Sequence, residues 1–547
     1  MKKSVTIMMV FFSTLVGLVS CSVDKKPYDS LTPEDLNNSP GSLESVTKGN
    51  YAKLKTMALG WHRVQEFPGD NVSLSGVTTS HLIYLYNYQR IPTNSFANSF
   101  WQNSYFVIAA ANKIIATVQE NQSAENDQLL GENYYLRALL HFSLCNVFGR
   151  PYSQGAQHLG VPIKIDADAY NYPQRATVGE VYQQVIADLL KAETLMNTFK
   201  SNVYASKEAA WALLSRVYLY MEDNEDAINY ANKVIESNRF SLLSTADFPN
   251  YPKFKPESNT ETIFAVKFMP DQDLADGGNS NIGSMYATIN GIGYGEMYAS
   301  DSYLNLVRRF PQDVRNQFIA PLYLNNGKEW AIYVNDAWQY VKVQVTKEGE
   351  HYYYAEGNTK KALEEELGLS GAKNYYIRLP NSQRKQVRVE PEIDQRNGYP
   401  KYFIIKCSQQ EGQAQLWSPI ISRLAEIYLN RAEAYAKLGK NAEALSDLNR
   451  IRSRAGIPEQ GLYSINNLPT GQSLLDVILD ERRLELAWEG HRKFDVFRNQ
   501  KVMDRKYPGV HLTGNSVIKE VSWQDAAAVE YIPESQILVQ EGLEQNP

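Results

Sequence analysis

The fold is decided by residues 421–458, ISRLAEIYLNRAEAYAKLGKNAEALSDLNRIRSRAGIP, and by residues 474–499, LLDVILDERRLELAWEGHRKFDVFRN. Between Arg423 and Leu438, bulky apolar side chains recur at helical spacing, with alanines between them that let a second helix approach closely. A short turn at Gly439 separates this run from a second periodic run. The pattern predicts two antiparallel helices joined by a tight turn.

This hairpin has a twin earlier in the chain. Residues 211–235, WALLSRVYLYMEDNEDAINYANKVI, superpose on 428–452 without a gap, so that Tyr218 falls on Tyr435. A stripe of large residues, a tight turn and a small residue early in the second helix resemble a tetratricopeptide repeat. A single hairpin of this kind cannot bury its apolar face, so several must stack. The sequence therefore predicts a mostly α-helical fold in which hairpins form a superhelical scaffold.

Two further segments supply helices that such stacking needs. They are 132–148, ENYYLRALLHFSLCNVF, and 178–196, VGEVYQQVIADLLKAETLM, and both are strongly periodic. The N-termini of helices are also marked, because Thr177 and Ser473 each have an acidic residue three positions further on. This spacing is the capping box, in which the two residues satisfy the free N–H groups of the first turn.

Together these segments resemble the SusD/RagB family of nutrient-binding outer-membrane lipoproteins. The resemblance is carried by YYLRALLHFSLCNVFGRP at 134–151, PQRATVGEVYQQVIADLLKA at 173–192, the twin hairpin at 207–235, RLAEIYLNRAEAYAKLG, ALSDLNRIRSRAGIP, ERRLELAWEGHRKFDVFR at 481–498, IPESQIL at 532–538 and EQNP at 544–547. The 481–498 segment is specific by itself, whereas tetratricopeptide-like periodicity is not. The resemblance runs from the N-terminus to the last residue with a gap in the middle.

The resemblance implies a SusD-like fold with four tetratricopeptide-like hairpins. It also implies a non-catalytic cell-surface protein that captures glycan and delivers it to a SusC-like TonB-dependent outer-membrane transporter. A peptide-binding homologue of the same type is an alternative. Two other classes stay open, namely a surface glycoside hydrolase built on a helical frame and a tetratricopeptide adaptor that binds only protein.

The N-terminus has the form of a bacterial lipoprotein signal. Lys2 and Lys3 precede an apolar stretch at 5–19, which is too short to span a bilayer. Leu18-Val19-Ser20-Cys21 then matches a lipobox, a branched apolar residue and a small residue before a cysteine. We expect acylation of Cys21 and an outer-membrane protein that faces the cell exterior. The alternative is an ordinary secretion signal with an incidental cysteine.

Composition argues against nucleic-acid binding, a disulfide framework and a metal site. The chain has 55 Lys and Arg against 61 Asp and Glu, a net charge of −6 at pH 7, which argues against nucleic-acid binding. After removal of the signal only Cys145 and Cys407 remain, which is no disulfide framework, although one bond between them stays possible. The seven histidines are scattered, so we expect neither a metal site nor a cofactor.

The middle of the chain loses the helical period. Alternating apolar residues at 332–345, 375–379 and 402–406 predict strands, separated by loops rich in Gly, Asn and Tyr. We therefore divide the chain into the signal peptide 1–20, the acylated cysteine and tether 21–40, a first scaffold part 41–240, a loop- and β-rich insertion on the ligand side 241–416, and a second scaffold part 417–547.

Loops at 61–94 and 275–300 are the candidate binding regions, since ligand sites tend to lie on loops held by a rigid scaffold. Aromatic rings can stack on the C–H faces of sugars, and polar side chains can bind the hydroxyls. The candidates are Asp70, Asn71, Tyr84, Tyr86, Tyr88, Arg90, Tyr286, Tyr294, Tyr298, Trp330 and Trp338. The three alternating tyrosines at 84–88 would share one face if that segment were extended. For each aromatic the alternative is a packed ring that holds its loop down.

We expect no catalytic residue. The carboxylates between Asp480 and Glu489 could suggest paired-carboxylate glycoside hydrolysis. Basic residues interleave with them at helical spacings, which favours ion pairs along one scaffold helix. His491 follows a glycine at a helix bend, and we interpret it as structural.

Overall fold

The computed structural model describes residues 41–547 except 77–79, 169, 369–370 and 515–516. The predicted signal peptide, the lipobox with Cys21 and the tether lie outside the described residues. In the part of the chain that is described, none of the helices combines the length and apolarity needed to cross a membrane.

The helices of the structure are α3 Ser42–Glu66, α4 Leu82–Tyr86, α5 Ser95–Thr117, α6 Ala124–Phe148, α7 Val178–Leu195, α8 Lys207–Met221, α9 Asn224–Glu236, α10 Asp301–Val307, α11 Leu424–Lys437, α12 Asn441–Arg454, α13 Leu474–Glu485, α14 Arg492–Arg498 and α15 Glu534–Val539. The strands are β1 Val72–Leu74, β2 Leu159–Pro162, β3 Arg175–Thr177, β4 Thr262–Ala265, β5 Met297–Ala299, β6 Ile319–Pro321, β7 Glu329–Val334, β8 Tyr340–Glu348, β9 His351–Glu356, β10 Thr359–Ala362, β11 Glu364–Leu367, β12 Lys373–Arg378, β13 Arg384–Pro391, β14 Gln395–Arg396, β15 Tyr399–Pro400, β16 Tyr402–Ile404, β17 Ile420–Arg423, β18 Met503–Asp504 and β19 Glu520–Val521. The fold is therefore mostly helical, as predicted.

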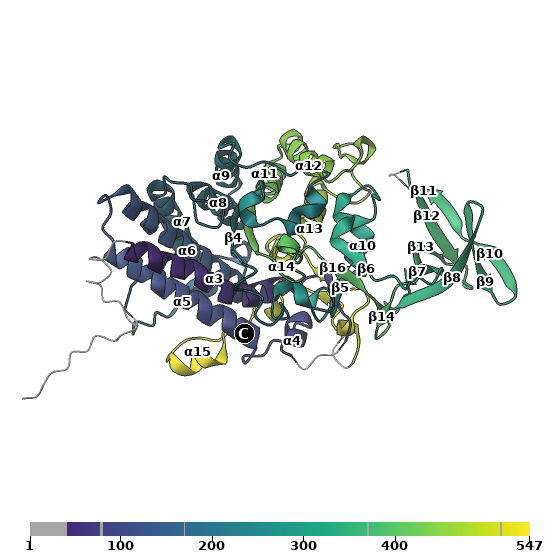
Figure 1. Ribbon diagram of the computed structural model, residues 1–547, viewed down its shortest axis with the longest axis horizontal. Helices are drawn as coiled ribbons and strands as arrows, with labels where there is room; N and C mark the ends of the chain where they lie inside the picture. Colours follow the sequence, from purple (N-terminus) through teal and green to yellow (C-terminus); the bar gives the residue numbers. More distant parts are fainter. Residues whose placement is uncertain (1–40, 77–79, 169, 369–370, 515–516) are drawn as a thin grey trace, which may run out of the picture. The chain divides into compact units, whose positions relative to one another are not determined.

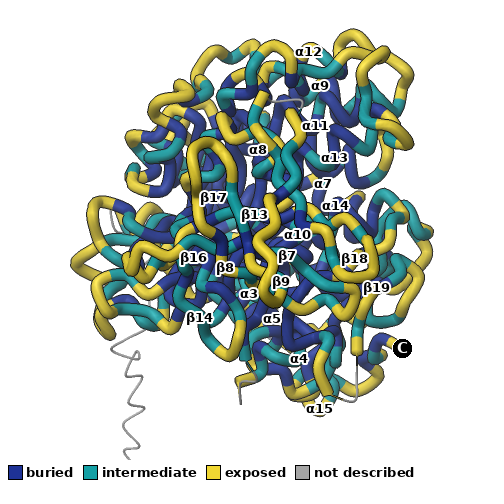
Figure 2. Tube along the Cα trace, turned by 90° about the vertical axis from the view of Figure 1, so that its right-hand side faces the viewer, coloured by how far each residue is buried: buried dark blue, intermediate teal, exposed yellow. Residues whose placement is uncertain are grey.

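The twin hairpins form and pack against each other. Helices α8 and α9 make the first, α11 and α12 make the second, and α11 lies against both helices of the first. A buried ion pair joins them, because Arg216 of α8 donates to both carboxylate oxygens of Glu426 of α11 at 2.6 and 2.7 Å. Helix α8 is buried along most of its length, whereas α9 and α12 keep an exposed face, drawn yellow at the top of Figure 2.

The predicted helix starts are also confirmed. The Thr177 hydroxyl accepts a hydrogen bond from the backbone N–H of Glu180, and the Glu180 carboxylate accepts one from the N–H of Thr177, which makes a complete capping box. Ser473 and Asp476 form the same arrangement at the start of α13. Cys145 and Cys407 are both buried and not bonded to each other, so the disulfide that the sequence left open is not formed.

A seven-stranded antiparallel sheet lies in the insertion, in the order β10-β9-β8-β7-β13-β12-β11, and Figure 1 shows it beyond α10. The alternating stretch at 332–345 is not one strand, because a turn with Trp338 at φ +52° divides it into β7 and β8. The sheet curls over its own small core. Tyr352 of β9 and Tyr375 of β12 touch edge-to-face at 5.3 Å between ring centroids, although three strands separate β9 from β12 in the sheet.

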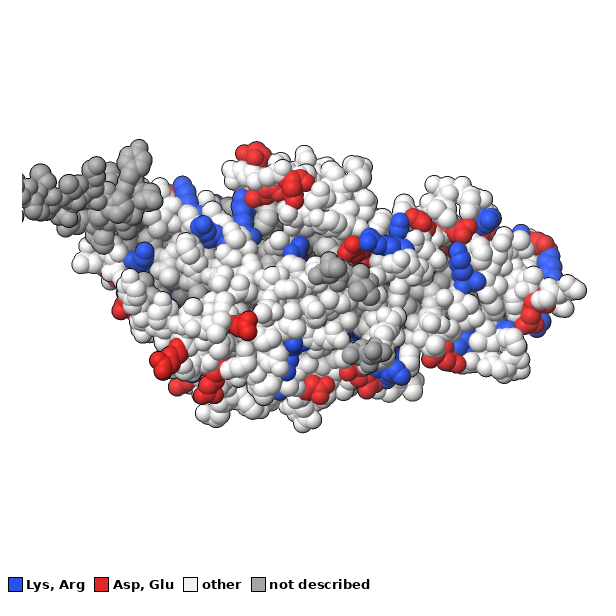
Figure 3. Space-filling model, turned by 90° about the horizontal axis from the view of Figure 1, so that it is seen from below, with Lys and Arg blue, Asp and Glu red and all other residues white. Residues whose placement is uncertain are grey.

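Ion pairs cover the outside of the sheet and fix it to the helices. Figure 3 shows basic and acidic side chains interleaved on the sheet, at the right of the view. At the base, Arg388 of β13 pairs with Asp301 of α10 at 2.7 Å, and Arg308 pairs with Glu390 at 2.5 Å. These partly or fully buried pairs hold the sheet against both ends of α10.

Candidate ligand-binding surface

The two predicted binding loops meet in the structure. Strand β1 from the first region pairs antiparallel with β5 from the second, with Ser73 opposite Tyr298. The pairing continues at both ends, where the N–H of Ser300 donates to the carbonyl oxygen of Asn71 at 3.1 Å and the N–H of Ser75 donates to that of Glu296 at 3.0 Å. Segments more than 200 positions apart in the sequence thus form one small platform.

A third segment, the β14–β15 hairpin, completes this platform. Its turn residue Asn397 donates from Nδ2 to the carbonyl oxygen of Ser75 at 3.0 Å. Arg396 donates to the carbonyl oxygen of Tyr294 at 3.2 Å and pairs with the Glu296 carboxylate at 2.8 Å. We call residues 75–76, 294–296 and 396–397 the loop surface.

The loop surface presents the chemistry that a sugar needs. The Tyr294 side chain is 56% exposed, Asn397 is exposed and the Arg396 side chain is 41% exposed. The guanidinium has five N–H donors, so its bonds to Glu296 and to Tyr294 leave others for a ligand hydroxyl. An aromatic face next to amide and guanidinium groups can stack on a ring and bind its hydroxyls.

Sequence reasoning missed Arg396 and Asn397, although a signal was present. Asn397-Gly398 lies between two short extended segments, and both residues have positive φ, +53° and +84°. An Asn-Gly pair with this geometry is the most favoured two-residue hairpin turn. The dipeptide predicts a hairpin tip, and hence an exposed polar site, from sequence alone.

Two polar candidates lie inside the protein. Asp70 is 2% exposed and forms a bidentate ion pair with Arg492, at 2.8 and 2.9 Å. Burial by itself would raise the pKa of Asp70, but Arg483 and Arg492 lower it to about 2. The Asn71 side chain accepts a hydrogen bond from Arg483 Nε at 2.9 Å. Both side chains therefore hold the start of β1 against the C-terminal helices.

The extended segment assumed for the three tyrosines at 84–88 is wrong, because α4 covers 82–86. Tyr86 is fully buried with its hydroxyl 2.8 Å from His511 Nδ1, and the Tyr88 hydroxyl donates to the carbonyl oxygen of Pro68 at 2.7 Å. Only Tyr84 stays partly exposed, with its ring 5.9 Å from that of His81. Helical geometry rotates successive residues by about 100°, so alternate positions do not share a face.

The remaining candidates are divided between the interior and the sheet. Tyr286 and Tyr298 are buried, and the Tyr286 hydroxyl lies 2.7 Å from His62 Nε2. Arg90 donates to the carbonyl oxygen of Pro547 at 2.8 Å and stacks on the Tyr531 ring. Trp330 and Trp338 lie on the β7–β8 hairpin beside Lys342 and Lys519, respectively, and thus outside the loop surface.

The three glutamates of the 481–498 segment belong to a buried ion cluster. It contains five carboxylates and five cations, namely Glu261, Asp313, Glu481, Glu485, Glu489, Arg315, Lys406, Arg423, Arg452 and Arg454. The sequence predicted ion pairs, but along one helix, and this is wrong. The partners come from the insertion, β17 and α12, because the α13 carboxylates point into the core rather than along its surface.

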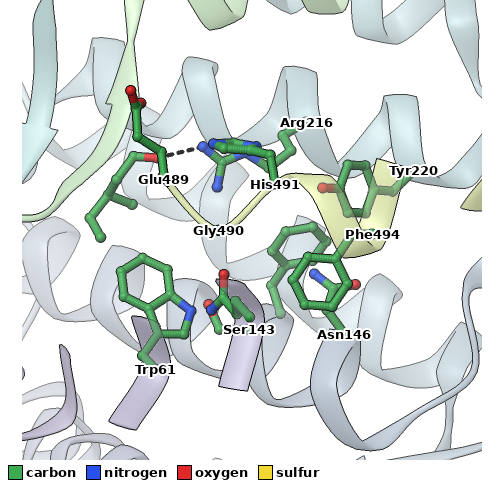
Figure 4. Close-up of a pocket in the computed structure, with 12 residues that line it drawn as sticks. Trp61, Ser143, Asn146, Arg216, Tyr220, Glu489, Gly490, His491 and Phe494 are labelled. Carbon is green, nitrogen blue, oxygen red and sulfur yellow. Dashed lines mark hydrogen bonds between the residues drawn. The ribbon is translucent and has the colours of Figure 1, made fainter. Parts of the chain in front are cut away.

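His491 lines a small internal cavity beside this cluster, together with Ser143, Arg216 and Glu489 (Figure 4). The cavity has about 20 Å³ of space, enough for one or two water molecules and far too little for a sugar ring. Burial lowers the pKa of His491 well below its usual value. The histidine is thus neutral and enclosed, in agreement with a structural role.

The described side chains do not form a metal site. Within the described part of the chain, His, Cys, Asp and Glu side chains do not gather in any group of three that would suit a metal ion. The ion cluster is saturated by its own opposite charges, so its carboxylates are occupied by arginine and lysine.

Comparison with known proteins assigns the fold to a family. A family model described as "SusD family" matches residues 260–547, more than half of the chain. The chain belongs to the SusD family. A second model, described as "Starch-binding associating with outer membrane", matches residues 23–219 of this SusD-family protein.

Relatives of similar length align along most of this SusD-family chain. SusD-like protein P2 of Formosa agariphila is 26% identical over 505 residues, covering 89% of each chain, and SusD-like protein P38 of the same organism is 25% identical, covering 94% of this chain and 95% of its own. A SusD superfamily structure from Bacteroides thetaiotaomicron has a TM-score of 0.72 at 24% identity and covers 94% of this chain and 100% of its own. A structure named a laminarin-binding SusD-like protein has a TM-score of 0.62 at 19% identity, covering 92% and 98%. The SusD-like fold expected from the sequence is confirmed.

Proposed function

We propose that this SusD-family protein binds glycan at the loop surface and does not cleave it. The observation that carries the proposal is the exposed Tyr294, whose backbone carbonyl oxygen accepts a hydrogen bond from Arg396, next to the exposed amide of Asn397. The description of one matching family as starch-binding, and the laminarin-binding SusD-like protein of similar fold, support the ligand class. The saturated carboxylates of α13 and the closed cavity at His491 support a role without hydrolysis.

We further propose that the protein is anchored in the outer membrane and delivers its ligand to a SusC-like TonB-dependent transporter. The family description "associating with outer membrane" and the lipobox at 18–21 support this placement. A protein that holds ligand in a shallow, exposed surface can release it without a chemical step, which suits capture and transfer. The transporter partner follows from the family resemblance.

The loop surface can be tested by replacing both Tyr294 and Arg396 with alanine. We expect the affinity for a bound polysaccharide to fall about tenfold or more, since the aromatic contact and the charge-assisted hydrogen bonds are each worth about 1 kcal/mol. The measurement is migration in native gels that contain starch, laminarin or another polysaccharide, with a reducing-end assay on the same mixtures.

Tyr170→Ala is the matched control, because Tyr170 is 85% exposed on the loop between β2 and β3. This variant should migrate like the unchanged protein. If the double variant Tyr294→Ala, Arg396→Ala is retarded by polysaccharide as strongly as the unchanged protein, the loop surface is not the binding site. Release of reducing ends would contradict a non-catalytic role. Tyr86 and Tyr88 are unsuitable for the test because both are buried.

The anchor has a separate test. Cys21→Ala removes the thiol that acylation needs, so we expect the protein to leave the outer-membrane fraction and appear in soluble fractions. Fractionation followed by detection with an antibody measures this, and metabolic labelling with a fatty-acid analogue should mark only the unchanged protein. Unaltered membrane fractionation of the variant would count against lipidation at this cysteine.

A further inference from the structure

A second pocket lies away from the loop surface. It opens between α3, the loop before α8 and the segment that follows β4, and it holds about 150 Å³ of space. Its lining residues are Lys48, Tyr51, Ala52, Leu54, Lys55, Val203, Tyr204, Ala265, Val266, Lys267, Met269 and Gln272. None of these belongs to the loop surface, so a ligand here would contact a separate set of side chains.

Two tyrosines form a fixed aromatic corner in this pocket. The rings of Tyr51 and Tyr204 meet edge-to-face, with centroids 5.1 Å apart and planes at 81°. The Tyr51 hydroxyl donates to the buried Glu132 carboxylate at 3.0 Å and accepts the N–H of Ala205 at 2.9 Å. The Tyr51 ring is therefore held in place before any ligand arrives, and both rings are only partly buried. Preorganised aromatic surfaces of this kind suit the apolar face of a sugar.

The charged side chains that line the pocket are all lysines. Three of its lining residues are lysines, and among the described residues that line it none carries a carboxylate. Lys55 pairs with Asp273 at 2.7 Å, and Lys267 pairs with Glu257. An ammonium group has three N–H donors, so one carboxylate partner leaves two donors for a ligand. An anionic group at the mouth would receive charge-assisted hydrogen bonds, the stronger kind.

The size of the pocket fits one sugar residue. A single water needs about 10–15 Å³ of such space, so 150 Å³ accommodates roughly ten to fifteen atoms of that size. A pyranose ring with its substituents is of this size. We propose that this pocket binds one anionic sugar residue, a uronate or a sulfated sugar, with its ring against Tyr51 and Tyr204 and its charge at Lys55 and Lys267. The proposal rests on the proposed function for the class of ligand.

The test compares two probes that differ only at C6, methyl β-D-glucuronide with a carboxylate there and methyl β-D-glucoside with a hydroxymethyl group, titrated into the protein and followed by NMR. We expect the glucuronide to bind about fivefold tighter or more, and added salt to weaken it, because the difference is an exposed charge-assisted hydrogen bond. Lys267→Ala and Tyr204→Ala should each weaken the glucuronide about fivefold or more. Lys267→Arg should retain most of the affinity.

The control is Lys113→Ala, which removes an exposed lysine of α5 outside the pocket and should bind the glucuronide normally. Thermal melts verify that each variant folds, and Lys267→Gln replaces Lys267→Ala if the alanine variant does not fold. Equal affinity for the two probes, or unchanged affinity for the glucuronide in the Tyr204 and Lys267 variants, overturns the proposal that this pocket binds an anionic sugar. If the unchanged protein binds polysaccharide but not the glucuronide, only this inference is overturned. If it binds neither, the proposed function is overturned as well.

Discussion

Replacing Glu485 by alanine is expected to lower the free energy of unfolding by about 3–5 kcal/mol, the usual cost of leaving a buried charge without its partner. Glu485 is fully buried, and Arg423 and Arg315 lie 2.6 and 3.4 Å from its carboxylate oxygens. Arg454 donates to the same carboxylate. Burial by itself would raise the pKa of Glu485, but the three arginines hold it well below its usual value.

The cost is large because the cluster is balanced and buried. Its five carboxylates and five cations cancel, so removing one carboxylate leaves one positive charge in excess where bulk water does not screen it. The variant also opens space beside three guanidinium groups that have lost a shared partner. Neither loss can be offset by solvent, unlike the loss of a surface ion pair.

Chemical denaturation at pH 7 measures the effect. The control is Glu366→Ala on β11, which removes an ion pair with Arg384 of β13. The Glu366 side chain is 55% exposed. We expect that control to change stability by no more than about 1 kcal/mol. Glu485→Gln separates charge from volume, because it keeps the shape and should still lose most of the stability. A Glu485→Ala protein as stable as the control would show that the cluster contributes little.

The helical part of the fold could be predicted from sequence because its signals are local. The spacing of apolar residues in 423–438, the turn at Gly439 and the capping boxes act over one to four residues, and the structure has each of them. The ion pairs of α13 could not be predicted in this way. Arg423, the N-cap of α11, and Glu485 are 62 positions apart, and packing of α11 against α13 brings them together.

The pairing of the two candidate binding loops fits their prediction as regions, but the exposure of individual residues in them could not be predicted. Loops 61–94 and 275–300 stand out by composition, and β1 and β5 join them. Whether a tyrosine in them is exposed depends on distant segments. Tyr86 is buried because His511, 425 positions away, meets its hydroxyl. Tyr294 lacks such a partner segment over its ring and stays exposed.

The segment that identifies the family also holds the binding loop. Arg483 donates to the carbonyl oxygen of Asp70 at 3.0 Å, and Arg492 pairs with the Asp70 side chain. These contacts fix the chain immediately before β1, on which the loop surface is built. The ion cluster in turn fixes α13, so the buried charges position the platform and leave its exposed side chains free to differ.

Glu66, at the C-terminal end of α3, is expected to make the free energy of unfolding depend on pH. Glu66 is 1% exposed, and its Oε2 accepts the N–H of Gly490 at 2.9 Å. Burial raises the pKa of this carboxyl from 4.5 to about 7, because backbone N–H groups, a long contact with Asn71 at 3.5 Å and the charge of Lys406 do not fully replace water. The protonated form is therefore favoured in the folded protein at mildly acidic pH.

The proton bound to Glu66 in the folded state determines whether stability rises or falls with pH. Between pH 4.5 and 7 the folded state holds a proton on Glu66 that the unfolded state has lost, so stability falls as pH rises through this window and is level above it. The shift of about 2.5 units corresponds to an upper bound of about 3 kcal/mol. Glu66→Gln cannot ionise and should not lose this contribution.

We therefore expect the difference in unfolding free energy between Glu66→Gln and the unchanged protein to move by about 2–3 kcal/mol in favour of the variant from pH 5 to pH 8. Denaturant titrations at several pH values give this difference, and every other titrating group cancels because both proteins share it. Asp271→Asn, which replaces an exposed carboxylate by an amide, is the control for the carboxylate-to-amide substitution itself. Parallel curves for Glu66→Gln and the unchanged protein would mean that Glu66 titrates near its ordinary pKa in the folded state.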